Sequence, residues 1–146
     1  MTMVANWESE DLHLIAETAY ELHLQGKHAE ALTIIEGVLT IDPSNIYALD
    51  AAAALSLTLR RPKDALDYAS TLLNIAPDHN QARARRCEAN ILLGRLQYAR
   101  YDVEKLNENA SPALYLRVRM RLRAVSRMST DTANSESFAG LSAITR

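Results

Sequence analysis

The side chains that most often do chemistry in proteins are few in this sequence: four histidines and one cysteine among 146 residues. The histidines are His13, His23, His28 and His79. No two of them are four residues apart, the spacing that places two metal ligands on one helix face, and none has a cysteine at ligand spacing. We therefore predict that the protein holds no metal and no cofactor.

Motifs that support catalysis or phosphate binding are also missing from the sequence. It contains no glycine-rich phosphate loop and no nucleophile elbow of the G-x-S-x-G type. The single cysteine, Cys87, excludes an internal disulfide, which agrees with a reducing compartment. The sequence therefore predicts a protein that is not an enzyme.

A run of arginines raises a third kind of chemistry, the binding of nucleic acid. In "LYLRVRMRLRAV", residues 114–125, apolar and basic residues alternate almost as in a half-buried strand. However, Ser111 and Pro112 before it are typical of a helix start, and no Gly or Pro follows until after Met128. On a helix, the apolar residues of one stripe fall within about 100° of arc. That stripe consists of Leu114, Tyr115, Val118, Leu122 and Val125.

In this helix the arginines spread over more than half of the circumference, so they do not form one basic stripe. One Phe and one Trp also provide few platforms for stacking bases. The sequence therefore argues against a nucleic-acid partner. Leu116 and Met120 lie on the far side of the helix. They are either a second contact surface or two scattered exposed apolar residues.

The composition indicates the elements that must position these residues. The chain is long enough for one domain, with 48% hydrophobic and 23% charged residues, and its four Gly and four Pro favour an all-α fold over a turn-rich β fold. The N-terminal residues carry Glu8, Glu10 and Asp11 where a signal peptide would be basic and then apolar. No stretch approaches the length of a membrane span. We expect a cytoplasmic protein without a membrane span.

The sequence repeats itself every 34 residues. "GKHAEALTIIEGVLTIDPSN" at 26–45 matches "RRPKDALDYASTLLNIAPDHN" at 60–80, and a third copy begins in "GRLQYARYDVEKLNENASP". Apolar residues within each copy follow a helical spacing. The positions that match are Ala31, Ala65 and Ala99; Gly26, Arg60 and Gly94; and Pro43 and Pro77.

A 34-residue period built from two helices resembles the tetratricopeptide repeat (TPR). The resemblance covers residues 12–45, 46–79 and 80–113. It implies an all-α, right-handed solenoid of three helix pairs, with a capping helix at about 112–127. We expect residues 1–127 to form one domain and residues 128–146, rich in Ser, Thr and Asn, to be a disordered tail.

This sequence departs from the family pattern at several positions. Arg60 replaces the usual glycine, and the proline of the third repeat is displaced to Pro112. The large aromatic residue near the start of each first helix is absent, and Ile15, Leu49 and Arg83 stand in its place. Cys87 occupies the small position where the two helices of a repeat meet. We therefore expect a buried structural thiol.

The resemblance also implies a binding site, because TPR solenoids bind extended peptides or helices along the concave face that is lined by the first helix of each repeat. Tyr20, Tyr47, Leu57 and Ile91 would form an apolar, aromatic floor. The side chains of Asp50 and Glu88 would act as polar acceptors. The candidate groove residues in this sequence are His13, Tyr20, His23, Tyr47, Asp50, Leu57, Arg85, Glu88 and Ile91.

The groove residues also bear on the kind of partner protein or peptide. TPR domains that bind the C-terminal carboxylate of heat-shock proteins present Lys, Asn and Arg side chains. Here Ala16, Tyr20, Ala54 and Gln81 fill clamp-like positions and only Arg85 is suitably basic. A carboxylate needs charged donors, so this client class is disfavoured.

A second resemblance, to the small three-repeat chaperones of bacterial type III secretion, rests on the total length, the acidic leading helix, "AYELHLQGKHAEAL" and "RCEANILLGRLQYA". These chaperones hold an extended segment of a translocator protein. The resemblance implies a small cytoplasmic chaperone or adaptor.

The charge distribution keeps an alternative open. Residues 1–50 hold nine acidic residues and one lysine, whereas residues 51–127 hold fourteen basic and seven acidic residues. The folded chain should therefore be an electrostatic dipole, with an acidic first part and a basic second part. Such a dipole can steer a partner or a second copy of the chain. The alternative is a structural subunit or self-associating scaffold, a homo-oligomer joined through the charge dipole and through Leu116 and Met120.

Overall fold

The structure, a computed structural model, describes residues 9–109 and 111–144, and in that part every regular element is a helix. Residues 1–8 of the predicted domain lie outside the described residues. No helix in the described part is long and apolar enough to cross a bilayer. The helices are α1 (Ser9–Leu24), α2 (His28–Ile41), α3 (Ile46–Thr58), α4 (Pro62–Ile75), α5 (Asn80–Leu92), α6 (Leu96–Lys105) and α7 (Pro112–Ile144).

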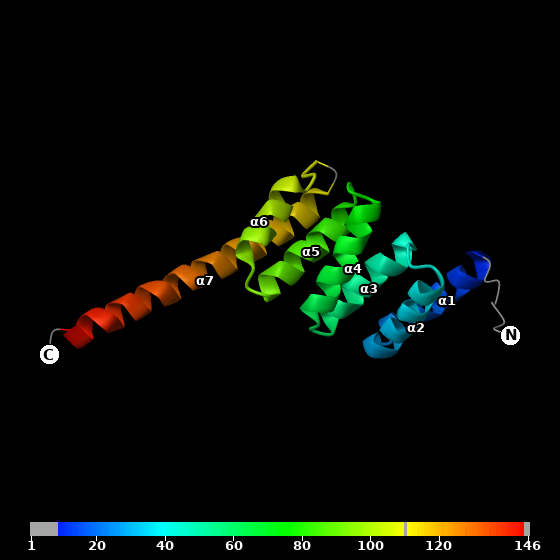
Figure 1. The fold of residues 1–146 in the computed structure, drawn as a ribbon, viewed down its shortest axis with the longest axis horizontal. Coiled ribbons are helices and arrows are strands. Elements are labelled where there is room, and N and C mark those ends of the chain that lie inside the picture. Colours follow the sequence, from blue (N-terminus) through cyan, green and yellow to red (C-terminus); the bar gives the residue numbers. More distant parts are fainter. Residues whose placement is uncertain (1–8, 110, 145–146) are drawn as a thin grey trace.

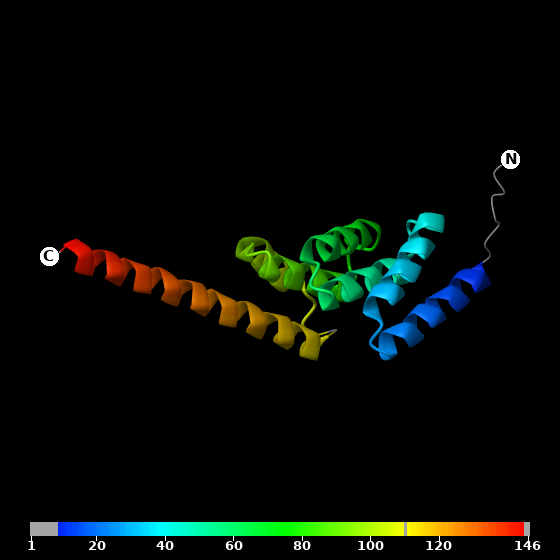
Figure 2. The same ribbon diagram turned by 90° about the horizontal axis from the view of Figure 1, so that it is seen from below.

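The helices form three consecutive pairs, α1/α2, α3/α4 and α5/α6, which stack along the long axis of the molecule (Figure 1). Each pair packs on the next, and α7 packs on α5 and α6. α1 lies at one end of the stack, and α7 extends beyond the other end as a single rod (Figure 2). The all-α solenoid of three helix pairs with a capping helix is therefore confirmed.

The first helix of every pair stops at the same place in the repeat. The second residue after the end of each of these helices has a left-handed backbone, with φ of 78° at Gly26, 60° at Arg60 and 73° at Gly94. At each stop two backbone bonds close the helix: for example, Lys27 N donates to Leu22 O and Gly26 N to His23 O, at 2.9 and 3.0 Å. This pair of bonds is the Schellman motif. The second stop is built with an arginine in a conformation that favours glycine.

Small residues at the crossing of each helix pair let the two backbones approach closely. Ala31, Ala65 and Ala99 each have no exposed surface, as the period of 34 predicts. Their partners on the first helices are Ala19, Ala53 and Cys87, which are 3%, 0% and 0% exposed. The repeat is therefore a packing unit, because a larger side chain at these positions has no free volume to enter.

Helix starts follow the predicted turn sequences. The Asn45 Oδ1 atom accepts a hydrogen bond from Ala48 N at 2.9 Å and caps α3, and His79 Nδ1 accepts from Ala82 N at 3.1 Å and caps α5. Pro62 begins α4 and Pro112 begins α7, where a missing N–H costs nothing. The turns therefore have the chemistry expected from "DPSN", "RRP", "APDH" and "SP".

The alternating segment at 114–125 is helical, as predicted. Its apolar stripe closes the stack: Leu114, Val118 and Leu122 are buried in one cluster with Cys87 and Val103, and Tyr115 and Val125 pack beside them. Leu116 and Met120 are 56% and 62% exposed, as expected for the far side. The two-residue alternation therefore reflects a helix whose outer surface is rich in arginine.

Beyond residue 127, where the sequence predicts a disordered tail, α7 continues without a break to Ile144. Residues 128–135 are exposed. Their hydroxyl groups bond to the carbonyls of the helix itself, as in Ser129 Oγ to Val125 O at 3.1 Å and Thr132 Oγ1 to Met128 O at 2.9 Å. Ser and Thr side chains that donate hydrogen bonds to carbonyl groups of their own helix are compatible with a helix, although an abundance of Ser and Thr is typical of disorder.

A buried carboxylate was not anticipated. Asp102 of α6 is 1% exposed, and Arg86 of α5 binds it through two bonds, Nε to Oδ2 at 2.9 Å and Nη2 to Oδ1 at 2.7 Å. Arg83 Nη1 approaches Oδ1 at 3.5 Å. The hydrogen bonds to Asp102 raise the pKa of Arg86 above its usual range, against the opposing effect of burial. Arg83 and Arg86 therefore fix the packing of α5 on α6.

The left-handed stops predict that the same substitution will have opposite effects at two glycines. A Cβ added at either Gly94 or Gly37 would meet nothing within 4 Å, so only the backbone differs. Gly94→Ala should destabilise the fold by about 1 kcal/mol through its positive φ. Gly37→Ala, inside α2, should stabilise it by about 0.5–1 kcal/mol. Urea unfolding measures both values, and equal signs would contradict this account.

The Asp102 site predicts a large effect of removing one charge. Asp102→Asn should lower the free energy of unfolding by about 2–3 kcal/mol, because two partly buried guanidinium groups lose their partner. Glu104→Gln, two residues further on and on the exposed side of α6, is the control and should change it by less than about 0.5 kcal/mol. Chemical unfolding of both variants checks this, and a neutral Asp102→Asn would contradict it.

Candidate functional site

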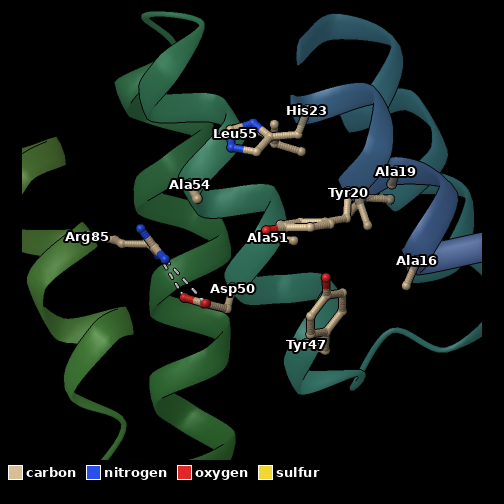
Figure 3. A pocket seen from close by; sticks show the side chains of 11 residues that line it. Ala16, Ala19, Tyr20, His23, Tyr47, Asp50, Ala51, Ala54, Leu55 and Arg85 are labelled. Carbon is tan, nitrogen blue, oxygen red and sulfur yellow. Dashed lines mark hydrogen bonds and ion pairs between the residues drawn. The ribbon is translucent and has the colours of Figure 1, made fainter. Parts of the chain in front are cut away.

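A hollow of about 230 Å³ lies between α1 and α3 and is bordered by α5. Side chains of three first helices line it, and Figure 3 shows them around the same space. Its floor is made of small residues, among them Ala16, Ala51 and Ala54. Since alanine fills little volume, the space above these residues is open to an incoming side chain.

Two tyrosines form the walls of this hollow. Tyr20 on α1 and Tyr47 on α3 are each 55% exposed, and their rings stand beside the floor (Figure 3). Tyrosine rings are large and lose little conformational freedom on binding, so they contribute strongly to protein interfaces. The hollow thus combines a small-residue floor with two aromatic walls, which suits a side chain that projects from an extended segment.

A bidentate ion pair closes the side of the hollow toward α5. Arg85 Nε donates to Asp50 Oδ1 at 2.7 Å and Arg85 Nη2 to Oδ2 at 3.3 Å. Both side chains are about one-quarter exposed. The pair links the second repeat to the third and neutralises both charges. Asp50 and Arg85 are both among the predicted groove residues, but nothing in the sequence indicates that they pair.

At the other end of the hollow, His23 contacts His28 across the α1/α2 turn. Their Nδ1 atoms are 3.0 Å apart, and the His23 ring lies 6.5 Å from the Tyr20 ring. A hydrogen bond between two Nδ1 atoms requires one donor and one acceptor. The described residues contain no cluster of three or more side chains that could hold a metal ion.

The remaining predicted residues lie elsewhere on the surface. His13 borders a neighbouring hollow that it shares with Tyr47, and its Nε2 lies 3.3 Å from Glu17 Oε1. Leu57, Glu88 and Ile91 line a separate hollow of about 470 Å³ between α3, α5 and α7. The predicted groove residues therefore fall into three hollows, of which the first two share Ala16 and Tyr47.

Two of these residues are already engaged within the chain. Glu88 accepts from Arg117 Nη2 at 3.1 Å and from Arg121 Nη1 at 3.0 Å, so both of its carboxylate oxygens are bonded to α7. Ile91 is 6% exposed and belongs to the core cluster under α7. α7 thus occupies the end of the surface that a fourth repeat would extend.

Part of the hollow is not among the residues predicted from the sequence, which are mostly large or polar. Ala19 and Ala51 line the floor, and Leu55 lies beside them. The sequence feature that could have indicated this floor is the run "DAAAAL" at 50–55, in which four consecutive alanines serve both the core and the surface. Two of them, Ala52 and Ala53, are buried without exposure, whereas Ala51 and Ala54 are half-buried and open to the hollow.

Cys87 has the environment of a structural thiol. It has no exposed surface, and its Sγ atom donates to the Ala99 carbonyl oxygen at 3.3 Å. Burial raises the pKa of Cys87 to about 12, with smaller contributions from the negative charges of Asp102 and Glu88. A thiol in this state contains very little of the thiolate that a nucleophile needs.

Comparison with known proteins shows what the fold is similar to. No family model matches the sequence, and no curated protein matches it either. Among solved structures, PcrH from Pseudomonas aeruginosa in complex with the chaperone-binding region of PopD has a TM-score of 0.76 at 18% identity, over 87% of this chain and 99% of PcrH.

Two further neighbours have the same architecture. The type III secretion translocator chaperone SycD of Yersinia enterocolitica has a TM-score of 0.76 at 16% identity, over 88% of this chain and 92% of SycD. The first TPR of Spaghetti (RPAP3), bound to the HSP90 peptide SRMEEVD, has a TM-score of 0.73 at 21% identity, over 85% of this chain and 99% of that chain. The protein has the fold of TPR proteins and of these chaperones.

The burial of Cys87 predicts that its thiol does not react in the native state. At pH 8 a thiol reagent should label the urea-unfolded chain completely while the native protein stays unlabelled, because labelling requires opening of the α5/α6 pair. A Cys87→Ser, Thr58→Cys variant, whose new thiol sits at an exposed position, is the control and should react at once. Rapid labelling of native Cys87 would contradict the assignment.

Proposed function

We propose that the protein is a non-catalytic interaction module, a small chaperone or adaptor that binds an extended segment of a partner protein on the surface formed by α1, α3 and α5. The observation that carries this proposal is the hollow with an alanine floor and two half-exposed tyrosine walls. Its chemistry is passive. Covering the apolar side chains of a client keeps them from aggregating, and release follows when another partner competes.

The walls and the floor of the hollow determine which kind of client segment can bind there. The Asp50–Arg85 pair leaves the hollow without net charge, while the tyrosines and alanines offer apolar contact and two hydroxyl groups. A segment that projects a medium-sized apolar or aromatic residue fits this space. We therefore propose an extended client with apolar anchors in place of a charged one.

The paired state of Arg85 argues against a client held by its C-terminal carboxylate. A carboxylate ligand needs free charged donors, and the one basic residue of this hollow is bonded twice to Asp50. RPAP3 shares the fold and binds an HSP90 peptide. Our chain would have to break its own ion pair to bind such a peptide in the same way.

Two of the neighbours support a more specific form of the proposal. PcrH was solved with a segment of PopD, and SycD is a translocator chaperone of type III secretion. The matches cover 87% and 88% of this chain. We therefore propose a bacterial, cytoplasmic chaperone that resembles those of type III secretion and holds one segment of a secreted client.

Replacing the two walls tests the proposal. A Tyr20→Ala, Tyr47→Ala variant should lose its client when intact protein and variant are used for capture from native lysate followed by mass spectrometry. Binding of a peptide from the identified client should weaken at least about tenfold in calorimetry, since aromatic anchors carry much of such affinity. Circular dichroism should show unchanged helicity, because both side chains are exposed.

The matched control is a Tyr98→Ala, Tyr101→Ala variant. These tyrosines are 68% and 54% exposed on α6, outside the hollow, so the two variants have the same composition. The control should retain the client. Loss of the client from both variants, or from neither, would sink the assignment of the site.

A further inference from the structure

The outward face of α1 is acidic and carries two exposed leucines. α1 packs mainly against α2, where Ala16 and Ala19 are buried, and it forms one end of the stack (Figure 1). Leu14 and Leu24 are 65% and 66% exposed. The residues of the outward face follow at steps of four, three, four and three: Glu10, Leu14, Glu17, Glu21 and Leu24.

The outward face of α7 has the same spacing with the opposite charge. Leu116, Met120, Arg123 and Arg127 are exposed and follow at steps of four, three and four. They lie opposite the stripe by which α7 covers α5 and α6. No carboxylate pairs with Arg123 or Arg127 among the side chains that the structure describes, whereas Arg117 and Arg121 are bonded to Glu88.

The two faces have residues at the same spacing and carry opposite charges. Steps of three and four repeat the heptad spacing by which two helices pack side by side. Leu116 and Arg123 are seven residues apart, as are Leu24 and Glu17, a distance of about 10 Å along either helix. An antiparallel pair can therefore set leucine against leucine and Glu17 against Arg123 at once. In a parallel pair, Leu14 would meet Leu116 and Glu21 would meet Arg123.

From this match we infer that α7 of one copy docks on α1 of a second copy, so that the protein associates head to tail. The occupant is a second copy because the chain itself supplies both the acidic and the basic face. α1 and α7 lie at opposite ends of the stack (Figure 2). A contact between unlike ends is heterologous, and it adds copies in a row instead of closing at a dimer.

The contact is weak and depends on salt. One helix packed on another buries less area than a stable complex needs, so association should be reversible and concentration-dependent. Exposed ion pairs contribute to it, and these are screened as ionic strength rises. Glu17 already lies 3.3 Å from His13 on its own helix, a side chain that is 77% exposed and free to move away.

Charge reversal at both ends tests the inference. Sedimentation equilibrium of the full chain from about 10 μM to about 1 mM should show an average mass that keeps rising at low salt and falls back at about 0.5 M NaCl. A Glu17→Arg, Glu21→Arg variant has two basic ends, and an Arg123→Glu, Arg127→Glu variant has two acidic ends. Each alone should stay monomeric, and their equimolar mixture should recover the association.

Two controls keep the result specific. Asp64→Arg, Asp78→Arg makes the same change in net charge at exposed positions between the two ends, and it should associate like the wild type. The Tyr20→Ala, Tyr47→Ala variant should also associate normally, because its two substitutions lie in the hollow between α1 and α3 and not on the outward face of α1. A wild type that stays monomeric at low salt, a mass that stops at the dimer, or a mixture without recovery would each overturn the inference.

Discussion

The close approach of two helices within each repeat is the constraint on which the rest of this structure depends. Ala31, Ala65 and Ala99 are buried without exposure at the crossings. With only small side chains between the backbones, each pair has one packed arrangement, and successive pairs can stack in only one way. This arrangement places α1, α3 and α5 around one hollow, which Ile35 of α2 also lines.

Polar contacts then connect each repeat to its neighbour. The Tyr68 hydroxyl donates to Glu36 Oε1 at 2.9 Å, Arg85 is bonded to Asp50, and Arg117 and Arg121 are bonded to Glu88. Burial and the neighbouring Glu36 carboxylate raise the pKa of Tyr68 to about 12. A solenoid gains its cooperativity from such nearest-neighbour interfaces. The same contacts pair charges between the repeats, whereas Arg123 and Arg127 of α7 have no carboxylate partner among the described side chains.

The two proposed interactions of this chain therefore use different places, the inner surface and the ends. The inner surface provides apolar volume between Tyr20 and Tyr47 without net charge, which supports the proposal of an extended client. The ends carry exposed leucines among charges of opposite sign, and this supports the inference of a head-to-tail contact. The two surfaces use different sides of α1, so one can be changed without the other.

The sequence by itself determined the repeat, its stops and its cap, because these depend on local rules: a left-handed residue ends a helix, and a small residue recurs where two helices cross. It also determined which stripe of the 114–125 helix is buried. Only the tertiary structure decided which charges meet. Asp102 is buried and bonded to Arg86, and Asp50 is bonded to Arg85, through contacts between side chains 16 and 35 residues apart. The hollow needed the tertiary structure as well, since its floor consists of alanines, and whether an alanine serves the core or a binding surface depends on the helix packed beside it.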